Sequence, residues 1–173
     1  MIFIKIVAIA LLILLSSFNT SDQSGKAGGN NSKMKIEFYL PLGGNAFSST
    51  PFAKVKTITN NGISNWTNSE EYYTAYFRIS EPGIFKFSID KESLVVLGKS
   101  TLEFSINNES KKVEFNNTKK DSYQIGSWEI KEPGYVALKI KGISKNKSNF
   151  PSISRVTINS SIAKEKIAFV QNN

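Results

Sequence analysis

Two stretches of this sequence share one plan, in which an alternating apolar segment, a Pro-Gly turn and a second alternating segment follow each other. The first stretch runs from Tyr73 to Ile89 around Pro82-Gly83, and the second runs from Trp128 to Ile140 around Pro133-Gly134. A two-residue period indicates a strand with one buried face, so each stretch predicts a β-hairpin. Pro82 fixes φ at the second turn position, and Gly83 is expected to take the positive φ of a type II turn.

The hairpin plan returns about fifty residues later, which favours two packed antiparallel sheets. Other segments with strand-like alternation are residues 34–42, 55–58, 100–106, 111–115 and 153–159. No segment shows a sustained helical period. The sequence therefore predicts an all-β protein, an antiparallel β-sandwich of about eight strands with almost no helix.

The amino-terminal end is typical of an exported protein. Lys5 precedes a short apolar run that is followed by small polar residues, so residues 1–20 are predicted to be a signal peptide. An uncleaved membrane anchor is the alternative. Residues 21–33 are predicted to be a flexible tether, because they hold almost nothing apolar. The expected location is the periplasm, the cell surface or the medium.

The sandwich domain is predicted to span residues 34–161. The segment that follows, residues 162–173, is interpreted as a tail or as the start of a second domain that is missing from this chain.

The sequence contains neither histidine nor cysteine, and this excludes several kinds of active site. No Ser-His-Asp triad, thiolate nucleophile or histidine-ligated metal can form. An enzyme here would need carboxylates, lysine or tyrosine. For a glycoside hydrolase that uses two carboxylates, Glu70 with Asp90 is the pair that can be nominated, although nothing in their spacing supports it. We therefore expect no catalysis. The net charge of +8 comes from scattered lysines, so nucleic acid is not an expected partner.

A loop around Trp66 is the main candidate for ligand binding. Asn68, Glu70 and Tyr72 follow it closely. An aromatic ring can stack on the C–H face of a sugar while amides and carboxylates take the hydroxyls. The alternative is that Trp66 caps an open end of the core. Trp128, which begins a strand, is predicted to be in the core.

Tyr76 and Arg78 share the side of their strand that faces away from the core. They either belong to an exposed platform, or Arg78 pairs with Glu103 or Glu129 across the sheet.

The order of these strands and turns resembles the jelly-roll carbohydrate-binding modules of the galactose-binding-like class. Residues 41–47, 63–66 and 134–136 look more closely like an uncharacterised domain family of secreted bacterial proteins, in which a second domain of unknown function follows. The resemblance implies that Asn45 and Asn149 lie near the ligand on one rim. It also implies that a structural calcium ion is possible, although no ligands for it are identified. Asparagine in a turn has the simpler explanation that it tolerates left-handed backbone geometry.

The sequence thus leads to one function and two alternatives. We expect an exported, non-catalytic module that binds a polysaccharide or glycan, needs no cofactor and does not contact a membrane after signal cleavage. The first alternative is a structural module that packs on a following domain, with an exposed apolar patch near Phe169. The second is the carboxylate-dependent hydrolase.

Overall fold

The computed structural model describes residues 36–51, 55–117 and 120–170, all of which belong to one compact unit, Ser32–Asn173. The predicted signal peptide and tether lie outside the described residues. Within these ranges there is no helix long and apolar enough to cross a membrane. The described residues form fourteen strands and two single turns of 3₁₀-helix. Their bounds are β1 Ile36–Pro41, β2 Ala46–Ser48, β3 Ile58–Thr59, β4 Gly62–Ile63, β5 Tyr72–Ile79, β6 Gly83–Asp90, η1 Lys91–Ser93, β7 Leu94–Val95, β8 Ser100–Ile106, β9 Glu109–Phe115, β10 Ser122–Ile130, β11 Gly134–Lys145, β12 Ser152–Ile153, β13 Arg155–Ser160, η2 Lys164–Lys166 and β14 Ile167–Phe169.

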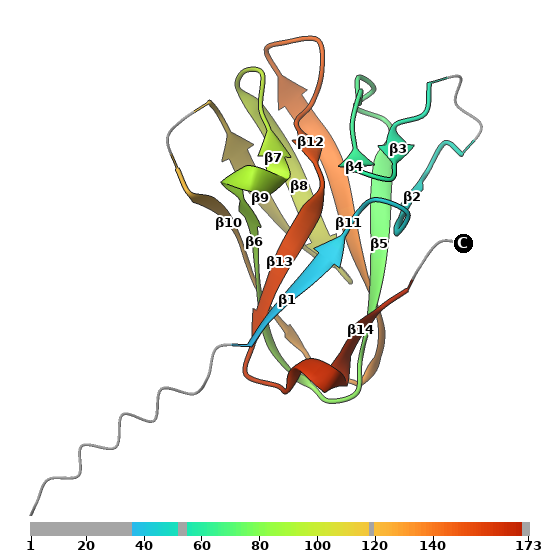
Figure 1. Ribbon diagram of the computed structural model, residues 1–173, viewed down its shortest axis with the longest axis vertical. Coiled ribbons are helices and arrows are strands. Elements are labelled where there is room, and N and C mark those ends of the chain that lie inside the picture. The colour runs from blue at the N-terminus through green and yellow to red at the C-terminus, as the bar shows by residue number, and fades with distance from the viewer. Residues whose placement is uncertain (1–35, 52–54, 118–119, 171–173) are drawn as a thin grey trace, which may run out of the picture. The chain divides into compact units, whose positions relative to one another are not determined.

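The strands form three antiparallel sheets (Figure 1). Sheet A has the order β1-β13-β6-β10. Sheet B has the order β14-β5-β11-β8-β9, and β2 also pairs with β5. Sheet C has the order β3-β4-β12-β7 and consists of short strands. The fold class is therefore the predicted one, an antiparallel β-sandwich. Eight strands have six or more residues, and the other six are pieces of two or three residues.

The core lies between sheets A and B, and the alternation in the sequence determines which side chains enter it. On β5 the buried side chains are Tyr73, Ala75, Phe77 and Ile79, and on β6 they include Phe85, Phe87 and Ile89. The ring of Phe77 lies 6.3 Å from that of Phe85 and 6.0 Å from that of Phe87, centroid to centroid, so the two strands contact each other across the core. Such interdigitation is what packs two sheets about 10 Å apart.

The predicted hairpins are wrong, although the strands themselves are confirmed. β5 belongs to sheet B and pairs with β11, whereas β6 belongs to sheet A and pairs with β10. Each Pro-Gly turn therefore arches from one sheet to the other, and the two arches lie side by side (Figure 1). Period-two alternation cannot distinguish these connections, because a hairpin and an arch both require one buried face on each strand.

The glycines of the two turns also differ from each other. Gly134 has a φ of 142°, a value that only glycine adopts easily, but Gly83 is not among the residues with positive φ. The type II geometry expected at Gly83 is therefore wrong. A Cβ at this position would lie 3.3 Å from Ile162 Cγ2, so close packing is what limits the side chain there.

The sandwich continues past the boundary predicted at residue 161. β14 pairs with β5 from Ile167↔Ile79 to Phe169↔Phe77, and the ring of Phe169 lies 6.1 Å from that of Phe38 on β1. The segment interpreted as a tail or as the start of another domain thus contributes a strand to sheet B. Phe169, around which the structural-module alternative expects an exposed apolar patch, is itself half-buried.

Candidate functional site

Trp66 is buried, and it is not available for stacking on a ligand in this structure. Its side chain is 0% exposed, its ring lies 4.9 Å from that of Tyr73 and 4.6 Å from that of Phe150, and its Nε1 donates a hydrogen bond of 2.7 Å to the Asn68 carbonyl oxygen. The interpretation of Trp66 as a sugar-stacking residue is therefore wrong, and the alternative that it caps the core is what the structure has. Trp128 is also buried, as predicted.

The loops that carry Trp66 and Asn149 do converge. The amide of Phe150 donates a hydrogen bond of 2.8 Å to the Trp66 carbonyl oxygen, and Asn149, which precedes it, is half-buried. Asn68 and Glu70 are exposed, and the Asn68 side chain accepts a hydrogen bond from the Glu70 amide at 2.9 Å. These groups lie near an end of the sandwich without an open aromatic ring among them.

The remaining predicted site residues lie in different surroundings. Asn45 is 4% exposed; its Nδ2 donates to the Gly43 carbonyl oxygen at 3.3 Å, and its Oδ1 has no hydrogen-bond partner among the residues that the structure describes. Tyr72 begins β5 and points away from the core, onto the outer face of sheet B. Of the six predicted residues, Trp66 and Asn45 are thus buried, and the other four are exposed or half-buried.

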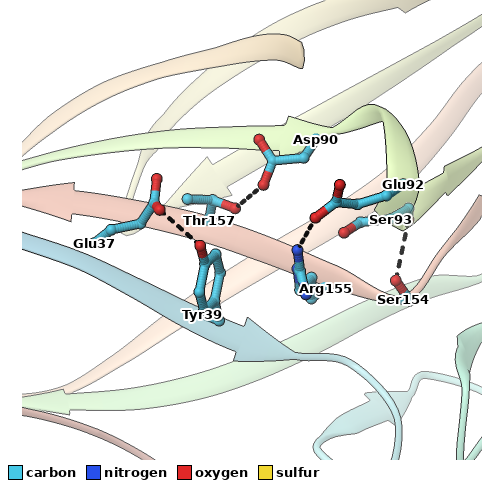
Figure 2. Close-up of polar contacts among 8 residues, drawn as sticks. All are labelled: Glu37, Tyr39, Asp90, Glu92, Ser93, Ser154, Arg155 and Thr157. Atoms are coloured by element: carbon cyan, nitrogen blue, oxygen red, sulfur yellow. Dashed lines mark hydrogen bonds and ion pairs between the residues drawn. The ribbon is translucent and has the colours of Figure 1, made fainter. Parts of the chain in front are cut away.

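The outer face of sheet A carries a polar network whose members are paired with each other (Figure 2). Arg155 forms an ion pair with Glu92, and its guanidinium lies 4.5 Å from the centroid of the Tyr39 ring. The Tyr39 hydroxyl donates a hydrogen bond of 2.7 Å to Glu37, and this bond and the charge of Glu37 raise the pKa of Tyr39.

The carboxylate pair nominated for hydrolysis is not assembled in any described contact. Asp90 accepts a hydrogen bond of 2.7 Å from Thr157 on the outer face of sheet A (Figure 2), whereas Glu70 precedes β5 of sheet B. Within residues 36–51, 55–117 and 120–170, no group of three or more acidic, histidine or cysteine side chains is placed to hold a metal ion.

The outer face of sheet B carries exposed aromatic side chains, and we call it the aromatic face. Phe47 on β2 and Tyr76 on β5 are each 37% exposed, and their rings contact edge to face at 5.6 Å. Tyr135 on β11 is 72% exposed and pairs in register with Arg78, next to Tyr76. Side chains of alternating residues stand on the same face, so Tyr72 and Thr74 belong to it as well. Exposed aromatic clusters are uncommon on proteins without a binding partner.

Cations lie among these rings. Lys139 Nζ is 3.7 Å from the centroid of the Tyr72 ring, and Lys141 pairs in register with Tyr72. Among the described residues, Arg78 makes no ion pair, so the alternative in which it pairs with Glu103 or Glu129 is not observed. The exposed platform suggested by Tyr76 and Arg78 is the arrangement in the structure.

A hollow of about 340 Å³ lies beside Phe47, between β2 and residues 55–58. Ser48 and Thr57 line it and donate hydrogen bonds of 2.6 and 3.2 Å to the buried carboxylate of Glu71. The nearby Tyr73 hydroxyl is buried, and no described residue forms a hydrogen bond with it. Burial is the largest effect on the pKa of Tyr73; it raises this pKa, as does the charge of Glu71, whereas Thr57 lowers it.

Sequence reasoning missed Phe47 and Tyr135 as surface aromatics. Tyr135 follows a turn glycine and alternates with the buried Val136, so its exposure could be found from the period alone. Phe47 could not, because its three-residue strand has too few residues to show a period.

The fold and this face define the chain as a β-sandwich domain with an aromatic outer surface. The chain belongs to the family described as a domain of unknown function, DUF5077, whose model matches residues 40–163. No curated protein matches it.

Several solved structures are similar at low sequence identity. The Podospora anserina GH26-CBM35 β-(1,4)-mannanase has 15% identity and a TM-score of 0.49 over 75% of this chain and 28% of that one. The CBM35 from Cellvibrio japonicus Abf62 has 10% identity and a TM-score of 0.49 over 71% of this chain and 92% of that one. A family two carbohydrate esterase from Cellvibrio japonicus has 8% identity and a TM-score of 0.48 over 81% of this chain and 36% of that one. This chain thus spans less than half the length of the mannanase and of the esterase.

Proposed function

We propose that this protein is a non-catalytic carbohydrate-binding module and that the aromatic face of sheet B is its binding surface. The observation that carries the proposal is the exposure of Phe47, Tyr76 and Tyr135 on one sheet face. A sugar ring presents a C–H face that stacks on an aromatic ring, while its hydroxyls bond to polar side chains beside the ring. Thr74 and Arg78, on the same side of β5, supply such groups.

The arrangement suits a chain of sugars better than a single small molecule. The three rings come from β2, β5 and β11, which are neighbours in sheet B. Strands in a sheet are about 4.8 Å apart, so the rings form an extended surface and not a closed pocket. A ligand on this surface is bound by several shallow contacts, which predicts weak binding to each sugar unit.

Export is part of the proposal and rests on the apolar run near the amino terminus. Recovery of the protein with cytoplasmic markers after expression and fractionation of its host would contradict that part alone.

The binding surface is tested by affinity electrophoresis in gels that contain one soluble polysaccharide each. We expect at least one polysaccharide to retard the purified chain, and we expect Tyr76→Ala and Tyr135→Ala to weaken the retardation. Tyr39→Ala is the matched control, because Tyr39 is 44% exposed but lies on the outer face of sheet A. If the parent and the three variants are retarded equally, or if Tyr39→Ala loses more retardation than the other two variants, the binding site is not on sheet B.

A further inference from the structure

We propose, on the basis of the function proposed above, that the ligand of the aromatic face is an anionic polysaccharide, one that carries carboxylate or sulfate groups. The proposal names the class of ligand for that same face. Its basis is the charge that the fold collects there.

The aromatic face has more cations than carboxylates. Arg78, Lys139, Lys141 and Lys112 stand on it, since each alternates with a residue that is buried or turned toward the core. Glu103, which pairs in register with both Lys141 and Lys112, is a carboxylate on this face. Glu114, a carboxylate of β9 on the same face, is already paired with Lys99 at 2.9 Å. The four cations make no ion pair with any described residue.

The outer face of sheet A has more carboxylates than cations. The positive charge is therefore not distributed evenly over the two outer faces, as a lysine-rich composition alone would make it. Arg155 on that face is paired with Glu92 (Figure 2), and Lys86 is its other cation. Against them stand the carboxylates of Glu37, Asp90 and Glu129, which face the same side. A protein with a net charge of +8 therefore has one acidic and one basic sheet face, and the basic one holds the exposed rings.

The spacing of the cations suits a polymer that lies along the strands. Arg78 pairs with Tyr135, and Lys139 pairs with Thr74, four residues further along β5. At about 3.3 Å per residue, these cations are about 13 Å apart, and Lys141 lies about 7 Å beyond Lys139. Tyr76 and Tyr135 lie at the Arg78 end of this row. Stacking on the rings and ion pairing further along can therefore act on one chain.

Nucleic acid is a poorer match for this row of charges. A nucleic-acid strand carries one phosphate about every 3.4 Å, and proteins that bind it place many cations along its path. The aromatic face has cations at much wider intervals.

The test uses pairs of polysaccharides that differ in charge and share a backbone. Polygalacturonate is compared with its methyl-esterified form, and dextran sulfate with dextran, by affinity electrophoresis and by isothermal titration calorimetry. We expect the purified chain to bind the charged member of at least one pair and to bind the neutral member at least about tenfold more weakly, with an affinity that falls as salt is added. The pair that responds identifies the charged group as carboxylate or sulfate.

The variant Arg78→Gln/Lys141→Gln is expected to weaken binding by about tenfold, since two exposed charge contacts are lost. Lys86→Gln/Lys91→Gln is the matched control, because it removes the same charge from exposed positions on β6 and η1. Its binding should change less than about twofold. Circular dichroism spectra that match the parent confirm that both variants fold.

Four results separate this inference from the proposed function. Equal binding to esterified and free polygalacturonate, with loss in Tyr76→Ala, overturns the anionic ligand and leaves carbohydrate binding intact. Absence of binding to every polysaccharide overturns both. If the control variant weakens polysaccharide binding as much as Arg78→Gln/Lys141→Gln does, the ligand is attracted to the net charge alone, and the proposed binding site on the aromatic face is overturned. Binding to a thymidine oligonucleotide in place of any polysaccharide overturns the inference in favour of nucleic acid.

Discussion

Replacing Trp66 by alanine distinguishes the two roles that a tryptophan in a loop can have, packing in the core and stacking on a ligand. In this structure Trp66 packs between Tyr73 and Phe150, and no part of its side chain is exposed. We therefore expect Trp66→Ala to lower the free energy of unfolding and to leave the affinity of the folded protein for its ligand nearly unchanged.

The size of the loss follows from the contacts. Truncation of a buried aromatic side chain costs about 3–5 kcal/mol, since the removed atoms leave a cavity. The hydrogen bond from Nε1 to the Asn68 carbonyl oxygen adds about 1 kcal/mol. Because domains of this size unfold with about 5–15 kcal/mol, the variant retains a fraction of its stability. Trp66→Phe keeps a ring between Tyr73 and Phe150, and so we expect it to lose about 1–2 kcal/mol.

Urea unfolding measures these changes. Trp128 is the second tryptophan of the chain and is buried, so its fluorescence reports unfolding in the parent and in both variants. Affinity electrophoresis below the unfolding midpoint then measures ligand binding by the folded population. An unfolding midpoint that stays within error of the parent, together with loss of retardation, would refute the assignment of Trp66 to the core and restore the loop as the binding site.

Three further predictions concern the polar and glycine positions. Tyr73→Phe should make the protein less sensitive to alkali. Burial raises the pKa of Tyr73, so the folded state keeps a proton that the unfolded chain loses above pH of about 10. Above that pH the unfolding free energy of the parent falls by up to about 1.4 kcal/mol per pH unit, and this loss should be absent in the variant. Urea titrations at several alkaline pH values that give parallel curves for the two proteins would contradict this. Gly62→Ala should lower the unfolding free energy more than Gly44→Ala, for which we expect a loss of about 1 kcal/mol. Both glycines have positive φ, but a Cβ at residue 62 would also lie 2.2 Å from the Ile153 carbonyl oxygen, whereas a Cβ at residue 44 would have no described atom within 4 Å. Glu92→Gln should change the unfolding free energy by less than about 1 kcal/mol. Glu92 pairs with Arg155, but its side chain is 72% exposed, and exposed ion pairs contribute little. A larger loss in thermal or urea unfolding would show that the polar network on sheet A contributes to stability.

The local chain conformation was largely predictable from the sequence. Alternation between Tyr73 and Ile79 identified both the strand and its buried face, since a period of two leaves one side of an extended chain apolar. The same reasoning placed Phe104 and Ile106 in the core. The short strand β2 was not predicted, because three residues carry no period and pair only when a neighbouring strand presents its free edge.

The candidate binding surface was predictable only in part. The outward position of Tyr76 and Arg78 followed from their alternation with Phe77. The convergence of Phe47 with Tyr76 did not, because it depends on the pairing of β2 with β5 across a gap of more than twenty residues. Trp66 shows the reverse error: its polar neighbours suggest an exposed loop, but Phe150 from a distant loop covers its ring.

By itself, the sequence determined the strand periodicity, the all-β class and which face of each long strand is buried, since these depend only on neighbours along the chain. Tertiary structure decided that both Pro-Gly turns connect opposite sheets, that β5 pairs with β11 and β6 with β10, and that Trp66 lies in the core. The physical reason is that alternation fixes the direction of a side chain but carries no information about the partner strand, which is chosen by packing between residues distant in sequence.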